Sequence, residues 1–311
     1  MTFLPESEFR IARARKSIAE MGLQALLITD RTNIGWISGF TGSSAYIILT
    51  STDAIFATDS RYTVQAETQC PGWTLRKLAS SDPGEIVGLL SKVDATRIGF
   101  EAVNLSFAAH SDYASKIPSG TEFVPTEKLI DGLRIVKDAT EIEATREACV
   151  IADRAFSHIL SYIKPGVTER TVMLELEGYI RREGGAEIAF DTIVASGYRS
   201  ALPHGLASEK VIESGDFVTL DFGARHRGYC SDMTRTVVVG GPTEKQVAVY
   251  NVVRGALEDA IAGVKPGVKG IDIDSIARNR IKDAGYGDYF GHGLGHSLFL
   301  LCFPLLEQSM A

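Results

Sequence analysis

The chain has 311 residues, of which 45% are hydrophobic and 23% charged, and its formal net charge is −7. This composition is typical of a folded globular chain with room for two domains, and it excludes a disordered polypeptide. The mildly acidic balance, without a long Lys or Arg run, gives no electrostatic basis for binding nucleic acid or anionic lipid. The cysteines form no Cys-x-x-Cys pair, and no apolar run approaches the ~20 residues of a membrane span. The first residues lack the features of a signal peptide. We therefore expect a cytoplasmic protein.

The first expected domain, residues 1–133, alternates helical and strand-like segments. Apolar positions at spacings of three and four predict a helix over 6–21, and similar patterns predict helices over 82–93 and 107–116. Short apolar runs predict strands at 25–28, 45–49 and 54–57, and the polar clusters 30–33 and 39–44 are expected to be turns. Together these elements predict an α/β domain with a mixed sheet.

One motif in this domain has two interpretations. The run Thr58-Asp-Ser-Arg-Tyr62 directly follows a strand-like segment. A charged turn that closes the strand is favoured over a catalytic role, because no nucleophile or metal-ligand spacing accompanies it. We therefore expect this domain to support the site or to contact a partner.

The second expected domain, residues 134–311, contains an internal repeat. Residues 153–185 and 254–287 both read as helix, Lys-Pro-Gly-Val, helix and a glycine-containing stop, with the motifs beginning at Lys164 and Lys265. Pro and Gly each end a helix, so the shared motif predicts a shared backbone. Thr140-x-x-Glu143 and Thr243-x-x-Gln246 match the capping box and predict helix starts. Matching flanks favour duplication over coincidence.

After the first copy the pattern changes to a sheet. The β-rich runs 217–222 and 229–239 flank a polar, glycine-containing turn, which predicts an antiparallel hairpin. A hairpin centred near residue 226 places Asp221 and Asp232 opposite each other on one face. Paired carboxylates suit a hard or borderline divalent cation, and this interpretation is favoured over two solvated aspartates.

Histidines supply further candidate groups. Gly291-His-Gly-Leu-Gly-His296 places two imidazoles four residues apart, and on an extended segment His292 and His296 would face one pocket. His204 lies in a loop rich in small residues, where it could stabilise an oxyanion or position a substrate carboxylate. For this single histidine, a structural role is an equal alternative.

The chain resembles the proline-directed metallopeptidases, aminopeptidase P and prolidase (Xaa-Pro dipeptidase). These enzymes share the pita-bread fold with methionine aminopeptidase and creatinase. The resemblance extends from about residue 8 to 296 and rests on ordered motifs: Gly39-Phe-Thr-Gly-Ser-Ser44, Thr58-Asp-Ser-Arg-Tyr62, Phe190-Asp-Thr-Ile-Val-Ala-Ser-Gly197, Ala201-Leu-Pro-His204, Asp221-Phe-Gly223, Tyr229-Cys-Ser-Asp-Met-Thr-Arg-Thr236 and His292-Gly-Leu-Gly-His296.

The resemblance implies an α/β plus α+β architecture, with a creatinase/prolidase-like N-terminal domain before a pita-bread domain. It implies that Asp221, Asp232 and His296 are metal ligands. His204 and His292 would act as catalytic or substrate-contacting histidines. The family's centre holds two Mn, Co or Zn ions and cleaves peptides with proline at the second position. The resemblance also implies a homodimer.

The resemblance ends after His296. The family continues with a third histidine followed by Glu and with two strands that each supply a glutamate ligand, whereas this chain has Phe303 at the histidine position. Glu307 matches neither glutamate ligand. By the measure of the first copy, the second hairpin would be complete about 29 residues beyond Ala311. The change of sequence pattern indicates a reading-frame change or premature stop, which is favoured over a genuinely divergent C-terminal segment. We accordingly expect an incomplete pita-bread domain that holds one cation well at most, with weak or no hydrolysis.

Three alternatives stay open at the level of sequence. Creatinase-type C–N hydrolysis does not require the full ligand set, although the retained Asp and His residues favour a metal-binding ancestry. A non-catalytic pita-bread module that binds a partner would explain the missing glutamates. A broken gene product without a selected function would explain them as well.

Overall fold

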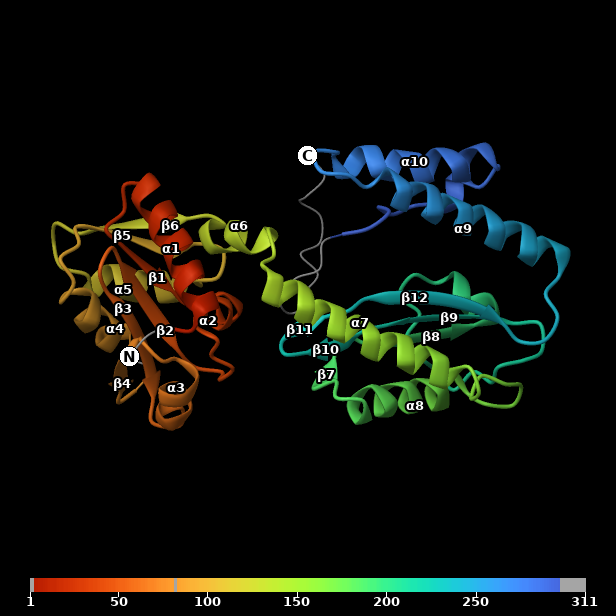
Figure 1. The fold of residues 1–311 in the computed structure, drawn as a ribbon, viewed down its shortest axis with the longest axis horizontal. Helices are drawn as coiled ribbons and strands as arrows, with labels where there is room; N and C mark the ends of the chain where they lie inside the picture. The colour runs from red at the N-terminus through yellow and green to blue at the C-terminus, as the bar shows by residue number, and fades with distance from the viewer. Residues whose placement is uncertain (1–2, 81–82, 297–311) are drawn as a thin grey trace. The chain divides into compact units, whose positions relative to one another are not determined.

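The structure, a computed structural model, describes residues 3–80 and 83–296. The chain divides into two compact units, with the division between Thr140 and Glu141 (Figure 1). The boundary expected from the sequence, between residues 133 and 134, falls inside helix α6 (Leu129–Ile135). Each unit is described separately below.

The first unit is built on one six-stranded mixed sheet of order β4-β3-β2-β1-β5-β6. Antiparallel pairing joins β1 to β2 and β2 to β3, and parallel pairing joins the remaining neighbours. The strands are β1 (Ala25–Ile28), β2 (Tyr46–Thr50), β3 (Ala54–Asp59), β4 (Thr74–Leu78), β5 (Arg97–Glu101) and β6 (Glu122–Thr126). With α6, the helices are α1 (Pro5–Glu20), α2 (Arg31–Ser38), α3 (Thr63–Gln69), α4 (Pro83–Leu90) and α5 (Phe107–Lys116).

The expected α/β architecture of this unit is confirmed. All four residues of β1 are buried, as in a strand that is covered on both faces. One expectation was wrong, because residues 30–33 begin helix α2 instead of forming a turn. The Asp30 carboxylate accepts a hydrogen bond from the Asn33 amide at 2.9 Å, so this polar cluster is a helix N-cap.

The motif at 58–62 closes strand β3. The Thr58 hydroxyl donates to the Ser44 carbonyl at 2.6 Å, and Asp59 accepts bonds from the amide and guanidinium of Arg61. The side-chain hydrogen bonds from Arg61 hold the pKa of Asp59 well below its ordinary value. These contacts fit the charged-turn interpretation of the motif.

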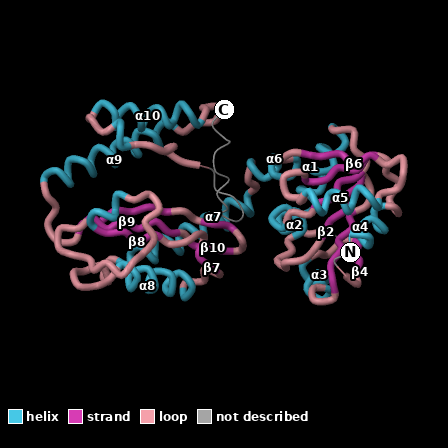
Figure 2. Tube along the Cα trace, turned by 180° about the vertical axis from the view of Figure 1, so that it is seen from behind, coloured by secondary structure: helices cyan, strands magenta, loops and turns pink. Residues whose placement is uncertain are grey.

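The described part of the second unit, which ends at residue 296, contains two small sheets and four long helices. The sheets have the orders β12-β9-β8 and β11-β10-β7. The strands are β7 (Glu187–Ile188), β8 (Ile193–Ser196), β9 (Phe217–Phe222), β10 (Ala224–His226), β11 (Tyr229–Cys230) and β12 (Met233–Val238). The helices are α7 (Ala139–Ile159), α8 (Glu169–Arg182), α9 (Glu244–Gly263) and α10 (Gly270–Asp283), with short 3-10 turns η1 (Gly197–Ala201) and η2 (Gly287–Tyr289). Helix α8 and the α9–α10 pair lie on opposite sides of the sheet (Figures 1 and 2).

The sequence repeat is also a structural repeat. Helices α7 and α8 form the first copy and α9 and α10 the second, and the glycines of the two Lys-Pro-Gly-Val motifs, Gly166 and Gly267, have φ values of 90° and 85°. The ends of the second helices match as well: the Gly185 amide bonds to the Ile180 carbonyl and the Tyr286 amide to the Ile281 carbonyl, both at 3.0 Å. The same backbone therefore forms twice at the same sequence offset.

The two predicted capping boxes have different outcomes. Thr243 and Gln246 form a complete capping box at the start of α9, as expected. The expectation for Thr140 was wrong, because α7 already begins at Ala139. The Thr140 hydroxyl instead donates to the Asp138 carboxylate at 2.6 Å.

The antiparallel hairpin is confirmed, but its centre differs from the expected position. His226 pairs with Tyr229, and the two residues between them, Arg227 and Gly228, both have positive φ values, of 50° and 86°. This is the backbone of a two-residue type I′ turn, which matches the twist of the strands. Asp221 consequently lies opposite Thr234, and Asp232 is its diagonal neighbour.

The last described segment, residues 290–296, is not a regular strand, because it bends at His292 and Leu294. The expectation of an extended segment was therefore wrong. Phe303 and Glu307 lie outside the described residues. Within residues 3–80 and 83–296, none of the helices combines the length and the apolar character that a bilayer crossing requires.

Candidate metal and catalytic site

Asp221 is positioned by the alternation of strand β9. Val218, Leu220 and Phe222 are fully buried in the core of the second unit, so Asp221 projects from the opposite face of the strand. Its carboxylate accepts a hydrogen bond from the hydroxyl of the facing Thr234 at 2.8 Å. The alternation of buried and outward-facing residues along β9 therefore fixes the direction of the Asp221 side chain.

Asp232 is positioned by a close crossing of two backbone segments. A Cβ atom built on Gly223 would lie 2.0 Å from the carbonyl oxygen of Ser231, so only glycine fits there. The Ser231 amide bonds to the Ala224 carbonyl at 2.9 Å, and the Ser231 hydroxyl accepts from the Ala224 amide at 3.0 Å. These bonds hold the residue immediately before Asp232. Since Asp232 stands two positions from Thr234, it shares the face of Asp221.

The two carboxylates are electrostatically coupled and partly desolvated. Burial raises the pKa of Asp221, and burial together with the negative charge of Asp221 raises the pKa of Asp232. The charges of His204 and His296 act on Asp221 in the opposite direction, and His296 does the same for Asp232. A positively charged partner would therefore stabilise the ionised form of both carboxyl groups.

The three candidate histidines occupy different surroundings. His296 Nε2 lies 3.4 Å from Asp232 Oδ2, and the Asp232 side chain is 26% exposed. His204 lies within electrostatic range of Asp221. His292 bonds to the carbonyl of Gly293 at 2.8 Å and interacts with Asp274 of α10. Thus His296 and His204 are placed with the aspartates, whereas the contacts of His292 are on the α10 side.

The expected ligands are Asp221, Asp232 and His296, of which His296 lies beside Asp232 and Asp221 shares the sheet face of Asp232. Across residues 3–80 and 83–296, no three His, Cys, Asp or Glu side chains converge closely enough to hold a metal ion. The pair of Asp232 and His296, with Asp221 on the same sheet face, is nevertheless a donor set of oxygen and imidazole nitrogen. Such donors suit Mn²⁺, Co²⁺ and Zn²⁺, so the residues present fit a divalent cation.

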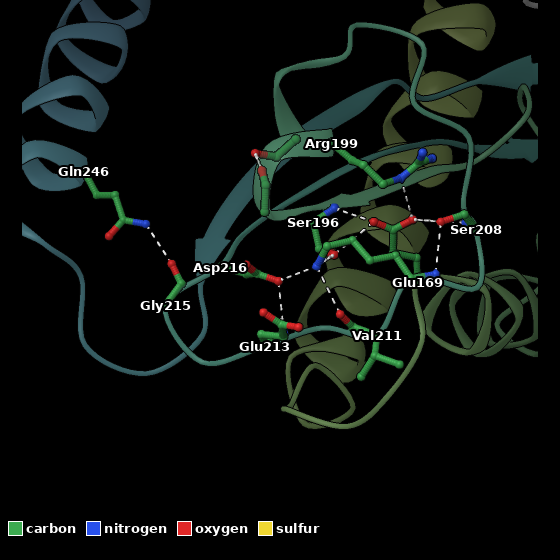
Figure 3. A network of polar contacts seen from close by, with 12 residues as sticks. Glu169, Ser196, Arg199, Ser208, Val211, Glu213, Gly215, Asp216 and Gln246 are labelled. Atoms are coloured by element: carbon green, nitrogen blue, oxygen red, sulfur yellow. Dashed lines mark hydrogen bonds and ion pairs between the residues drawn. The ribbon is translucent and has the colours of Figure 1, made fainter.

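A second group of polar residues was not anticipated from the sequence. Glu169, at the start of α8, is fully buried, and its carboxylate accepts hydrogen bonds from Ser196, Arg199 and Ser208 (Figure 3). Burial disfavours its charge, but the bonds from Ser208 and Ser196 outweigh that effect and lower its pKa. Lys210 extends the group by bonding to Ser196 and Asp216 at 3.0 and 2.7 Å. Only the sequence repeat could have pointed to Glu169, because the equivalent position of the second copy is Gly270 and a glutamate is therefore not needed for the shared backbone.

Another unanticipated group holds the histidine-bearing segment. Asp274 accepts two bonds from the Arg278 guanidinium and one from the Leu294 amide at 2.8 Å. Arg278 in turn donates to the carbonyls of Phe290 and His292, at 2.9 and 2.8 Å. A buried acid and its arginine on α10 thus fix the backbone just before His296.

The mixed sheet of the first unit and the duplicated helices and hairpin of the second unit together define a two-domain protein of the α/β plus α+β class. The family model for metallopeptidase family M24 matches residues 143–302, and that for the creatinase/prolidase N-terminal domain matches residues 10–136. The chain belongs to metallopeptidase family M24 and is a peptidase.

Relatives with solved or curated descriptions support this assignment. The Xaa-Pro dipeptidase from Bacillus anthracis is 42% identical with a TM-score of 0.91, covering 95% of this chain and 82% of that one. The X-Pro aminopeptidase from Thermotoga maritima is 38% identical with a TM-score of 0.86, covering 92% and 82%. The Xaa-Pro dipeptidase of Pyrococcus furiosus is 37% identical over 294 residues, or 94% of this chain and 82% of the relative. The expected creatinase-like domain followed by a pita-bread domain is therefore confirmed.

Proposed function

We propose that this protein is a metal-dependent exopeptidase that hydrolyses the bond between an N-terminal residue and a following proline. The observation that carries the proposal is the shared sheet face of Asp221 and Asp232, with His296 at 3.4 Å from Asp232, in a member of family M24. The activities after which the relatives are named, Xaa-Pro dipeptidase and X-Pro aminopeptidase, support the substrate class.

In this proposal Asp221, Asp232 and His296 are the residues that would hold the cation. When a divalent ion is bound, such a centre supplies a water of lowered pKa and polarises the scissile carbonyl. The protein supplies position: β9 fixes Asp221, the Gly223–Ser231 crossing fixes Asp232, and the Asp274–Arg278 pair fixes the segment that leads to His296. Mn, Co and Zn are the candidate metals.

His204 is the residue that we assign to contact the substrate or the oxyanion, because it is exposed and within electrostatic range of Asp221. His292 is the second candidate for substrate contact. Its interaction with Asp274 favours a role in shaping the wall of the site. The homodimer and the cytoplasmic location stay predictions, which size-exclusion chromatography with light scattering and cell fractionation would check.

The proposal is tested with the purified chain incubated separately with Mn²⁺, Co²⁺ or Zn²⁺. Release of free amino acid is measured from Xaa-Pro dipeptides, from longer Xaa-Pro peptides and from matched Xaa-Ala peptides. We expect weak cleavage that is confined to the bond before proline, and the ratio of dipeptide to longer-peptide cleavage distinguishes a dipeptidase from an aminopeptidase. Hydrolysis of creatine instead of peptides would support the C–N hydrolase alternative and overturn the proposal.

Asp221→Asn and Asp232→Asn test the site itself. Each removes one negative charge from the donor set, so we expect bound metal, measured by mass spectrometry, and peptide cleavage to fall together by about 10-fold or more. Asp272→Asn, at an exposed position in the first turn of α10, is the matched control and should leave both unchanged. Full metal binding and cleavage in both site variants would refute the assignment.

A further inference from the structure

The buried Glu169 carboxylate joins two points of the chain that are twelve residues apart. Its Oε1 atom accepts from the amide and hydroxyl of Ser196 at 2.7 and 2.9 Å. Its Oε2 atom accepts from the amide and hydroxyl of Ser208 at 3.1 and 2.7 Å, and from Arg199 Nε at 3.1 Å. We call these five bonds the Glu169 bridge (Figure 3). One carboxylate thus closes the loop formed by residues 197–207, and it does so in a fully buried position.

The Glu169 bridge is not required to form the helix on which it stands. In the second copy of the repeat the equivalent residue is Gly270, and α10 begins there with the same backbone and the same preceding turn. Thr168 already caps α8 by accepting a bond from the Thr171 amide. Since helix formation accounts for neither the burial nor the five bonds, the role of Glu169 lies in the loop.

The loop places His204 by a chain of short contacts. Within it, Arg199 donates to the Leu206 carbonyl at 2.7 Å, and the Leu206 amide donates to the His204 carbonyl at 2.9 Å. Leu206 forms a β-bridge with Ile193, and Ile193 is the residue that faces Asp221 across strands β8 and β9. His204 is therefore two residues from Leu206, which pairs with the strand residue that faces Asp221.

We propose that Glu169 is a positioning residue: by closing the 197–207 loop it holds the backbone of His204 beside Ile193, the residue that faces Asp221. This inference rests on the proposed peptidase function for its catalytic consequence. A partial loss of the bridge lets the loop ends separate, and a misplacement of about 1 Å at a reacting group can cost on the order of 100-fold in rate.

The experiment uses the full chain with Glu169→Gln, which keeps the side-chain size but replaces one acceptor oxygen with an NH₂ donor. The first measurement is hydrogen exchange of the peptide that contains His204, which requires no activity. We expect faster exchange in residues 197–207 and unchanged exchange in the body of α8. Glu177→Gln, on the same helix, is the matched control and should leave hydrogen exchange unchanged both in residues 197–207 and in α8. Unchanged loop exchange in Glu169→Gln overturns the proposal, whether or not any peptide is cleaved.

The second measurement is a double-mutant cycle on Xaa-Pro cleavage. Glu169→Gln alone should lower kcat/KM about 10-fold or more. In a His204→Ala background the same change should lower kcat/KM by less than about a further 2-fold, because both substitutions remove the same contribution, that of a correctly placed His204. Losses that multiply would mean that Glu169 acts independently of His204 and would overturn the positioning role. If the wild-type chain cleaves no Xaa-Pro peptide, the proposed function fails, while the exchange measurement still decides whether Glu169 closes the loop.

Discussion

The two copies of the helix, Lys-Pro-Gly-Val, helix unit share a backbone but not a core. In the first copy Val172, Leu176 and Ile180 are fully buried in the cluster that includes the sheet. In the second copy the corresponding positions contribute Ala277 and Ile281, and the cluster of buried residues is formed largely by alanines. The motif therefore specifies the turn and the helix ends, whereas the residues on the buried face decide how much apolar surface each copy removes from water.

The copies also differ in how they hold the chain segment that bears histidine. The first copy uses Glu169, buried and bonded largely to neutral donors, to hold the loop of His204. The second uses Asp274, paired with the partly exposed Arg278, to hold the segment before His296. Both copies thus use a buried acid on the second helix with an arginine partner. Glu169 takes most of its bonds from serine amides and hydroxyls, whereas Asp274 depends on an arginine that is more exposed, 39% against 21%.

The largest expected effect comes from the core difference. Ile180→Ala should reduce the free energy of unfolding by about 2–5 kcal/mol, because it leaves a cavity in a closely packed cluster. Ile281→Ala, the equivalent change, should cost clearly less, since Ile281 is 7% exposed and the other buried members of its cluster are alanines. Urea unfolding of both variants measures the difference. Equal losses would show that the copies are equally well packed.

A smaller effect concerns the two acids and their dependence on pH and salt. In the folded chain the pKa values of Glu169 and Asp274 are below their ordinary values of 4.5 and 3.8. A lowered pKa means that the stabilisation is present above the ordinary value and is lost as pH falls through the folded value. We therefore expect the stability difference between wild type and Glu169→Gln or Asp274→Asn to shrink below about pH 4.

Salt separates these two variants. At 1 M salt the screening length is about 3 Å, which weakens exposed ion pairs much more than buried hydrogen bonds. The loss caused by Asp274→Asn should therefore shrink in 1 M NaCl, because Arg278 is 39% exposed, whereas the loss caused by Glu169→Gln should persist. The opposite pattern in urea unfolding would contradict the distinction between an acid bonded mainly by serines and an acid that depends on a partly exposed arginine.

The smallest expected effects are at the helix starts. Thr168 caps α8, whereas its counterpart Lys269 gives α10 no side-chain cap. Thr168→Ala should cost about 1 kcal/mol and Lys269→Thr should gain up to about 1 kcal/mol, since a hydroxyl there accepts an orphan amide. Thermal and urea unfolding measure both. A Lys269→Thr variant without any gain would indicate that the first turn of α10 is satisfied in another way.

Much of the fold could be predicted from the sequence, because local signals agree with the tertiary structure. The apolar run at 25–28 and the helical period at 107–116 are reproduced with the same bounds, and the repeated motif predicts both helix pairs. The polar cluster at 30–33 was misassigned, since an N-cap and a turn use the same residue types. The hairpin centre was displaced by about one residue, because the positive φ of Arg227 is not a property that its residue type suggests.

The candidate site was only partly predictable. Asp221 and Asp232 follow from hairpin symmetry, and His296 follows from its glycine-rich setting and is placed beside Asp232. His292 interacts with Asp274 instead, because the 290–296 segment bends and residues four apart in it no longer point the same way. Glu169 was missed because a charged residue in the first turn of a helix ordinarily lies in solvent. Its burial depends on Ser196, Arg199 and Ser208, which approach it only in the folded chain.

The crossing of Gly223 and Ser231 has a practical consequence for protein engineering. The close approach of Gly223 to Ser231, with the two bonds between Ser231 and Ala224, lies between the turn at Arg227 and Gly228 and the two aspartates, so a change at the turn reaches the aspartates only through these contacts. A short epitope or a fluorophore attachment sequence could be inserted at this tip, giving a reporter close to the chemistry that leaves the spacing of the acids intact.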